Sequence, residues 1–281
     1  MQKLLIKGGK KLSGEVVISG SKNASLPIII SSLLFDDSVH FENFPKVRDI
    51  FTLINLIKVL GREVEFNEEK EILKISNKNK NKYFAPYSIM RTMRAGVLVL
   101  APLLAKFGKA RVSLPGGCSI GARPVNLHLE ALKKLGAKIN VKNGYIDAIA
   151  PKGLSGSNIK FPSISVGATE SIIIAAVLAK GITKISNAAI EPEIIDLINF
   201  LNKCGADIKY NSKRKIIIKG VKYLYPIKHR IIPDRIEAAT YAIAALITNG
   251  KLLIKNVNND HLENIFNVLK KSGAKIKTFK D

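Results

Sequence analysis

A segment that occurs four times along the chain constrains the fold more than any other feature. Each copy has an amphipathic helical pattern, then a glycine, then an alternating strand pattern, and the glycines are Gly61, Gly136, Gly205 and Gly273. Their spacing of 68 to 75 residues is typical of one supersecondary unit used repeatedly. Because each glycine directly follows a helix, we expect it to end that helix with a positive φ, which glycine adopts without steric strain.

Each repeat continues the same pattern of helix, strand, helix, strand, strand. The first helices are expected at 24–34, 88–106, 168–180 and 235–248, and the second helices at 47–60, 125–135, 193–203 and 262–271. The closing strand pairs are expected at 63–66 with 72–75, 138–141 with 146–149, and 207–210 with 215–219, while the fourth unit offers one strand at 275–279. Alternating helices and strands predict an α/β fold.

The overall composition fits a folded protein. With 281 residues, of which 47% are hydrophobic, the chain can form about two domains with substantial cores, and this excludes a mainly disordered state. The longest apolar runs, 26–35 and 97–105, are well short of the roughly 20 residues that a membrane span needs. Lysines and glycines interrupt the N-terminal apolar residues, so we expect no secretory signal and a cytoplasmic location.

The basic balance has two interpretations. Lysine and arginine number 45 against 22 acidic residues, a net charge of +23. The lysines are scattered, with few aromatic residues among them that could stack on bases. We therefore interpret the excess mainly as a solvated lysine surface rather than a nucleic-acid interface, and as a weaker alternative the charge steers anionic substrates.

A glycine-rich stretch lies between a strand pattern and a helix pattern. Gly116 and Gly121 have the spacing of a nucleotide phosphate loop, but Ala122 and Arg123 stand where that loop needs Lys and Ser/Thr, so a Walker site is excluded. Cys118 lies in this loop, close to an arginine and to a helix start, and these surroundings favour a reactive thiolate. The alternative is that this thiol is a small apolar residue in a turn.

Other candidate residues are fewer and individually weaker. Lys22 lies at a helix start, where an anion can be held. Arg91 and Arg94 belong to an otherwise apolar helix pattern and need an anionic partner or solvent. Among the histidines only His128 is beside a candidate site, and Cys204, at the end of an amphipathic helix, is interpreted as a packing residue. Neither cysteine has neighbours at metal-ligand spacing, so we expect no disulfide and no metal site.

With these residues in hand, the chain resembles the UDP-N-acetylglucosamine 1-carboxyvinyltransferase family of enolpyruvyl transferases. The matching segments are 21–24, 92–95, 114–125, 165–169, 191–194 and 232–237. The resemblance implies an inside-out α/β barrel of repeated αβαββ units. It also implies a complete three-unit domain at 21–232, and a partial second domain formed by 1–20 and 233–281.

The resemblance implies a reaction as well. The family transfers the enolpyruvyl group of phosphoenolpyruvate to the 3-hydroxyl of UDP-N-acetylglucosamine and releases phosphate, the first committed step of peptidoglycan synthesis, without a metal or organic cofactor. Cys118 would be the general acid on a loop that closes over substrate, and would form a covalent phospholactoyl adduct. The implied substrate-binding residues are Lys22, Asn23, Arg94, Arg123, Pro124, Val125, Asn126, Leu127, Ser163, Ile164, Ser165, Val166 and Asp234, the last near a hinge between domains.

Two departures and three interpretations remain. Ser163 stands where the family commonly has lysine, and Asn126 where it commonly has aspartate. Family enzymes have six units, and the two further units carry a catalytic aspartate, so a separate C-terminal fragment is a conceivable partner. On the first interpretation, the chain is an enzyme of this family or a shortened product of its gene. On the second, it is a binding module that holds the nucleotide sugar without releasing phosphate. The third interpretation is a basic nucleic-acid binder, which would bind RNA with a steep salt dependence.

Overall fold

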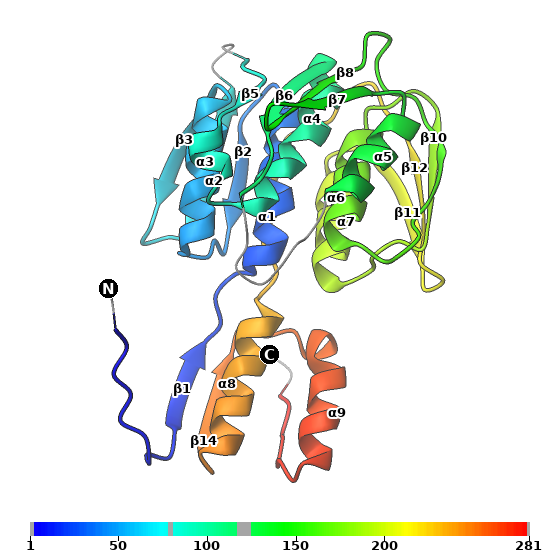
Figure 1. Cartoon of the computed structure of the whole chain (residues 1–281). Helices are drawn as coiled ribbons and strands as arrows, with labels where there is room; N and C mark the ends of the chain where they lie inside the picture. Colours follow the sequence, from blue (N-terminus) through cyan, green and yellow to red (C-terminus); the bar gives the residue numbers. More distant parts are fainter. Residues whose placement is uncertain (1–2, 78–80, 117–124, 280–281) are drawn as a thin grey trace. The chain divides into compact units, whose positions relative to one another are not determined.

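The computed structural model describes residues 3–77, 81–116 and 125–279. The chain forms two compact units, which we describe separately: the larger is Lys22–Ile231, and the smaller combines Met1–Ser21 with Ile232–Asp281. Figure 1 labels the helices and strands of both.

The larger unit contains three sets of helices and strands. Its helices are α1 (Lys22–Ser31), α2 (Arg48–Val59), α3 (Tyr87–Met90), α4 (Leu100–Phe107), α5 (Asn126–Lys134), α6 (Val166–Ala176) and α7 (Pro192–Lys203), with 3₁₀ segments η1 (Ser32–Leu34) and η2 (Arg94–Val99). Its strands are β2 (Val39–Glu42), β3 (Arg62–Asn67), β4 (Ile72–Asn77), β5 (Phe84–Ala85), β6 (Lys109–Ser113), β7 (Lys138–Lys142), β8 (Tyr145–Ile149), β9 (Asn158–Lys160), β10 (Ile182–Ser186), β11 (Asp207–Asn211), β12 (Lys215–Lys219) and β13 (Lys228–Arg230).

The strands form three sheets with one shared pattern. The strand orders are β13-β2-β4-β3, β5-β6-β8-β7 and β9-β10-β12-β11. In each sheet the first short strand is parallel to its neighbour and the other pairs are antiparallel. The short strands β5 and β9 come directly before the other strands of their own sheets, the second and the third. The short strand of the first sheet is β13, which comes after the third repeat in the chain and pairs with β2 of the first repeat. The larger unit is therefore closed on itself.

Helices occupy the inside of this unit and sheets cover it. In α6 every residue from Ala168 to Ala176 is buried, and α1 is buried from Ala24 to Ser31. The sheets are two-faced, since Ile216 and Ile218 of β12 are fully buried while Ile217 between them is 44% exposed. Figure 1 shows the sheets around the central helices. The α/β fold with an inside-out arrangement, expected from the sequence, is confirmed.

The repeated glycines have the expected conformation. Gly61, Gly136, Gly205 and Gly273 have φ values of 96°, 96°, 97° and 94°. Each follows the end of a helix, namely α2, α5, α7 and α9 (Glu263–Lys271). The backbone reversal after the helix therefore depends on the same left-handed conformation in all four repeats, and in the first three it leads into a strand.

One expected helix is broken, and this part of the sequence interpretation was wrong. The region 88–106 forms α3, an extended residue at Met93 with φ −142° and ψ 111°, then η2 and α4. Pro102 lies in the first turn of α4, where its missing N–H leaves no helical hydrogen bond unmade. In a continuous helix the ring of Pro102 would clash with the carbonyl of Leu98, so the α-helical part begins only at Leu100.

The smaller unit has little core of its own. It contains β1 (Ser13–Val17), α8 (Arg235–Ile247), β14 (Lys251–Lys255), η3 (Asn259–Leu262) and α9, and β1 is parallel to β14. Its buried apolar cluster consists of Ile18, Ala238 and Leu262 with partly buried neighbours. The strand expected at 275–279 is not formed, because no strand among the described residues offers its backbone a hydrogen-bonding partner.

Over the described ranges, no helix combines the length and the apolar character that crossing a membrane requires.

Candidate functional site

Two groups of predicted binding residues lie at the starts of neighbouring helices. Val125 and Leu127 are half-buried around the exposed Asn126, which begins α5. Ser165 precedes α6, and its Oγ accepts a hydrogen bond from the N–H of Ala168 at 3.3 Å. Since α5 packs against α6, the structure brings these two sequence segments together.

The exposed side of the α6 start carries the rest of the second group. Ser163 and Ile164 are exposed in the loop before the helix, and Val166 is 39% exposed at its first position. Ser165 therefore caps the helix while its neighbours remain open to solvent. A helix start with free N–H groups is a favourable position for an anion.

His128 connects the two helix starts. Its ring is 5% exposed, and its Nδ1 is 2.8 Å from the Oγ of Ser171 on α6. The ring also lies over Gly167, where a Cβ would be 3.0 Å from the His128 Cε1. Glycine at that position is thus what allows the imidazole to approach the first turn of α6.

Arg94 supplies positive charge in the same region. It begins η2, is half-buried, and η2 packs against α6. Burial and, as the smaller contribution, the positive charge of Arg94 together lower the pKa of His128 to about 4. His128 is therefore neutral at physiological pH, and Arg94 carries the charge beside it.

Lys22 and Asn23 begin α1, which also packs against η2. The Nζ of Lys22 is 3.2 Å from the Oδ2 of Asp49 on α2, and its side chain is 40% exposed. Asn23 is exposed. Lys22 is thus held at a helix start by a half-exposed ion pair.

Four of the predicted residues remain. Cys118, Arg123 and Pro124 lie outside the described residues. Asp234 belongs to the smaller unit, where its Oδ1 caps α8 by accepting hydrogen bonds from the N–H groups of Ile236 and Glu237 at 2.8 and 3.1 Å. Asp234 is therefore the N-cap residue of α8.

A buried glutamate was missed in the sequence. Glu170 of α6 is 5% exposed, and burial raises its pKa to about 8, with the negative charges of Glu193 and Glu191 acting in the same direction. The signal was available, because Glu170 precedes the apolar run 172–179 on a helix with no polar face. Glu170 therefore retains a proton near neutral pH.

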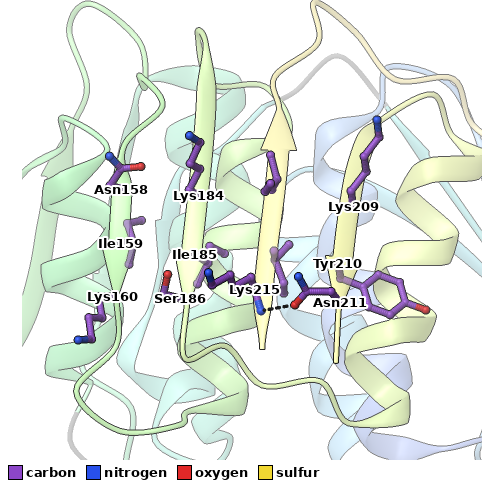
Figure 2. Close-up of a pocket in the computed structure, with 12 residues that line it drawn as sticks. Asn158, Ile159, Lys160, Lys184, Ile185, Ser186, Lys209, Tyr210, Asn211 and Lys215 are labelled. Atoms are coloured by element: carbon purple, nitrogen blue, oxygen red, sulfur yellow. Dashed lines mark hydrogen bonds between the residues drawn. The ribbon is translucent and has the colours of Figure 1, made fainter. Parts of the chain in front are cut away.

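A separate hollow lies on the outer face of the third sheet. Figure 2 shows Lys184, Lys209 and Lys215 projecting from strands β10, β11 and β12, and the N–H of Lys215 donates to the Oδ1 of Asn211 at 3.3 Å. The register aligns Lys209, Ile217 and Lys184 in one row across the strands. None of the predicted binding residues that the structure describes lines this hollow, so we interpret it as part of the solvated lysine surface.

Among the described residues of the larger unit, two cationic side chains lie at or near helix starts. Arg94, Lys22 and the first turn of α6 favour negative groups, while His128 and Ser165 provide neutral polar atoms. This combination is suited to holding phosphate or carboxylate groups.

Comparison with known proteins agrees with this chemistry. The family model for EPSP synthase (3-phosphoshikimate 1-carboxyvinyltransferase) matches residues 6–281. A UDP-N-acetylglucosamine 1-carboxyvinyltransferase of Pelagibacter ubique (strain HTCC1062) is 55% identical over 276 residues, which are 98% of this chain and 66% of that protein. The enzyme of the same name from Endomicrobium trichonymphae is 50% identical over 281 residues, 100% of this chain and 67% of that protein. This chain spans about two thirds of the length of these relatives.

Solved structures support the fold independently. The enolpyruvyl transferase NikO from Streptomyces tendae superposes with a TM-score of 0.86 at 20% identity, covering 98% of this chain and 65% of that one. EPSP synthase from Acinetobacter baumannii superposes with a TM-score of 0.76 at 20% identity, covering 95% of this chain and 61% of that one.

Proposed function

Because this chain belongs to the EPSP synthase family of carboxyvinyltransferases, we propose that it serves the transfer of an enolpyruvyl group from phosphoenolpyruvate to the 3-hydroxyl of UDP-N-acetylglucosamine. The observation that carries this proposal is the identity of 50% and 55%, over nearly the whole chain, to relatives named for that acceptor. The grouping of Arg94, Lys22 and the α6 start supports it, since both substrates are anionic.

The proposed reaction is an addition followed by an elimination. The 3-hydroxyl of the sugar gives its proton to a base, its oxygen O3 bonds to C2 of phosphoenolpyruvate, and C3 gains a proton, which gives a tetrahedral intermediate. Loss of a proton from C3 and cleavage of the C2–O bond to phosphate then release inorganic phosphate and leave the enol ether. Cations that neutralise the phosphate and carboxylate groups favour both steps.

Each described residue has a proposed part in binding. Lys22 and Asn23 bind phosphoenolpyruvate at the start of α1, and Arg94 binds near the nucleotide sugar. The start of α5 (Val125, Asn126 and Leu127) and the loop before α6 (Ser163, Ile164, Ser165 and Val166) bind the uridine diphosphate.

The residues outside the described ranges complete the proposal. Cys118 is the general acid and forms the phospholactoyl adduct, and Arg123 and Pro124 contribute to the substrate sites. Asp234 contributes from the smaller unit. We propose that a separate chain equivalent to the rest of the family fold supplies the base for the sugar hydroxyl.

The adduct gives a direct test with this chain alone. We expect phosphoenolpyruvate together with UDP-N-acetylglucosamine to increase the mass of the Cys118 peptide by one phosphoenolpyruvate, since addition of the thiolate to C2 needs only a proton at C3. The Cys118→Ala variant is the matched control, and Cys204 in the same digest is an internal one. Unmodified Cys118 at saturating substrates, with the nucleotide sugar bound, would favour a module that binds without chemistry.

A further inference from the structure

Four lysines surround one exposed isoleucine on the outer face of the third sheet. The strand register places Lys184 of β10 and Lys209 of β11 directly beside Ile217 of β12, one on either side. Lys215 and Lys219 lie two positions before and after Ile217, and side chains two positions apart project from the same face of a strand. All four lysines are exposed, and Ile217 is 44% exposed. Three of these lysines can be followed in Figure 2.

The positive charges of this group are not neutralised by acids. Among the described residues, no carboxylate lies within ion-pair distance of any of the four lysines. Asp207 of β11 is opposite Lys219 in the register, but the two side chains form no ion pair. Because strands are about 4.8 Å apart and each residue adds about 3.3 Å, the four lysine Cα atoms lie within roughly 15 Å of one another. The group therefore concentrates positive charge on a small area.

The other two sheets balance part of the charge on their outer faces. Ion pairs between their strands are Lys74–Glu65 at 3.0 Å, Lys228–Glu42 at 2.6 Å and Arg111–Asp147 at 3.5 Å. All three sheets have the same pattern of strands, so this difference arises from the side chains and not from the architecture. Unpaired positive charge around an apolar centre distinguishes the third sheet.

The chemistry of the group favours an anionic lipid surface over other anionic partners. Arginine forks and aromatic rings are the side chains best suited to nucleic-acid phosphates and bases, and the group contains neither. Lysine is depleted in protein–protein interfaces, where arginine and aromatic residues are enriched. A bilayer surface attracts lysines as simple point charges, and it accepts an aliphatic side chain at the boundary between headgroups and acyl chains.

We propose that the outer face of the third sheet docks on an anionic phospholipid bilayer. Lys184, Lys209, Lys215 and Lys219 lie against the headgroup phosphates, and Ile217 reaches the acyl boundary between them. The net charge of +23 adds attraction before contact is made. Such docking requires no helix that crosses the bilayer. It is independent of the proposed transfer, because none of the described binding residues belongs to this face.

Vesicle co-sedimentation of the full chain tests the role of the lysines. We expect binding to vesicles of phosphatidylcholine and phosphatidylglycerol at about 0.1 M salt and weaker binding at about 0.5 M, because salt screens exposed charges. Vesicles of phosphatidylcholine alone should bind little of the chain. The variant Lys184→Gln/Lys209→Gln/Lys215→Gln should lose on the order of a hundredfold in partition coefficient, since each lysine near an anionic surface contributes roughly fivefold.

A matched control removes the same charge from other exposed positions. Lys58→Gln/Lys138→Gln/Lys142→Gln changes one lysine of α2 and two of β7, all of them exposed. We expect its partition coefficient to stay within about threefold of wild type, because these charges are far from the docked face. Urea unfolding of both triple variants shows whether each is folded, and we expect wild-type stability since every substituted side chain is exposed.

Tryptophan fluorescence tests the position of Ile217 without removing any charge. The chain has no tryptophan, so Ile217→Trp introduces a single reporter. With phosphatidylglycerol vesicles its emission should move to shorter wavelength, as expected for an indole that enters the bilayer interface. Ile149→Trp is the matched control, because Ile149 is 46% exposed on the second sheet between Lys109 and Lys138, with Asp147 two positions before it. Its emission should not move.

The outcomes decide between a docking face and a merely charged surface. Equal losses in the two triple variants, equal binding to phosphatidylcholine alone, or equal shifts in the two tryptophan variants would each overturn the inference. Binding of single-stranded RNA that requires the three lysines, without vesicle binding, would assign the face to nucleic acid and overturn it too. Failure of vesicle binding leaves the proposed transfer standing, and vesicle binding by a chain that forms no Cys118 adduct leaves this inference standing.

Discussion

At the scale of single residues, the larger unit buries two ionisable groups whose pKa values move in opposite senses. Burial lowers the pKa of His128 to about 4, and burial raises that of Glu170 to about 8. Both groups are uncharged near neutral pH as a result. The sequence indicated His128 through its neighbours, but it did not indicate Ser171 as its partner, because a contact between two helices depends on their packing.

Glu170 should make the protein less stable as pH rises. Its folded pKa, about 8, is above the ordinary 4.5, so its contribution is fully present below pH 4.5 and is lost between there and pH 8. The Glu170→Gln variant cannot ionise at this position. At pH 8.5 we expect its unfolding free energy to be higher than that of wild type by on the order of a few kcal/mol, and at pH 5 we expect a much smaller difference. Urea unfolding at both pH values measures this, with the exposed Glu69→Gln as control. Equal pH dependence in wild type and Glu170→Gln would contradict it.

Cys204 should be chemically inert in the folded protein. The side chain is fully buried, and burial raises the pKa of its thiol to about 12. We expect no alkylation of Cys204 by iodoacetamide at pH 8 in the native state and complete alkylation in denaturant. Peptide mapping by mass spectrometry checks this, and native alkylation as fast as denatured would disprove the packing role predicted from the sequence.

At the scale of elements, local sequence signals predicted most helices and strands, and failed where the deciding contact was distant. The four capping glycines were predictable because positive φ is a property of the residue itself. The end of the expected helix 88–106 also had a local signal, because Pro102 cannot lie inside a continuous helix. The missing strand at 275–279 had none, since a strand there depends on a neighbouring strand that the described residues do not form. Pairing of β13 with β2 joins segments nearly 190 residues apart, and no local pattern encodes it.

The closing strand β13 should depend on one buried pair. The Nε2 of His229 in β13 is 3.0 Å from the Oδ1 of Asp196 in α7, and both side chains are about 95% buried. We expect Asp196→Ala to lower the unfolding free energy by roughly 1–3 kcal/mol, because it leaves a buried imidazole without a partner. Denaturant unfolding should show this loss, with Asp207→Ala on the exposed face of β11 as control, and equal stability of the two variants would refute it.

At the scale of the whole molecule, the two units differ in how completely they bury their apolar residues. The larger closes its three sheets around central helices, whereas the smaller has one two-stranded sheet and a small cluster at Ile18, Ala238 and Leu262. Exposed apolar side chains of the smaller unit include Ile236 at 50% and Ile247 at 77%. The sequence predicts this difference, because three repeats at 21–232 can cover one another's apolar faces, whereas the single repeat formed by 1–20 and 233–281 cannot cover its own.

The three-unit domain predicted at 21–232 should therefore fold by itself. We expect a fragment with these boundaries to unfold cooperatively, and the full chain to exchange amide hydrogens faster in α8 and β14 than in α1 and α6. Hydrogen exchange with mass spectrometry on the full chain and urea unfolding of the fragment test this. A fragment without cooperative unfolding, or uniform protection across both units, would count against independent folding.

The central claim is that this chain serves carboxyvinyl transfer to UDP-N-acetylglucosamine, and phosphate release tests it most directly. The chain would be mixed with the separately produced final third of the Pelagibacter ubique relative and supplied with phosphoenolpyruvate and one acceptor. We predict phosphate release that requires UDP-N-acetylglucosamine, that does not occur with shikimate 3-phosphate, and that disappears in Cys118→Ala. Release with shikimate 3-phosphate instead, or equal release by Cys118→Ala, would contradict the account.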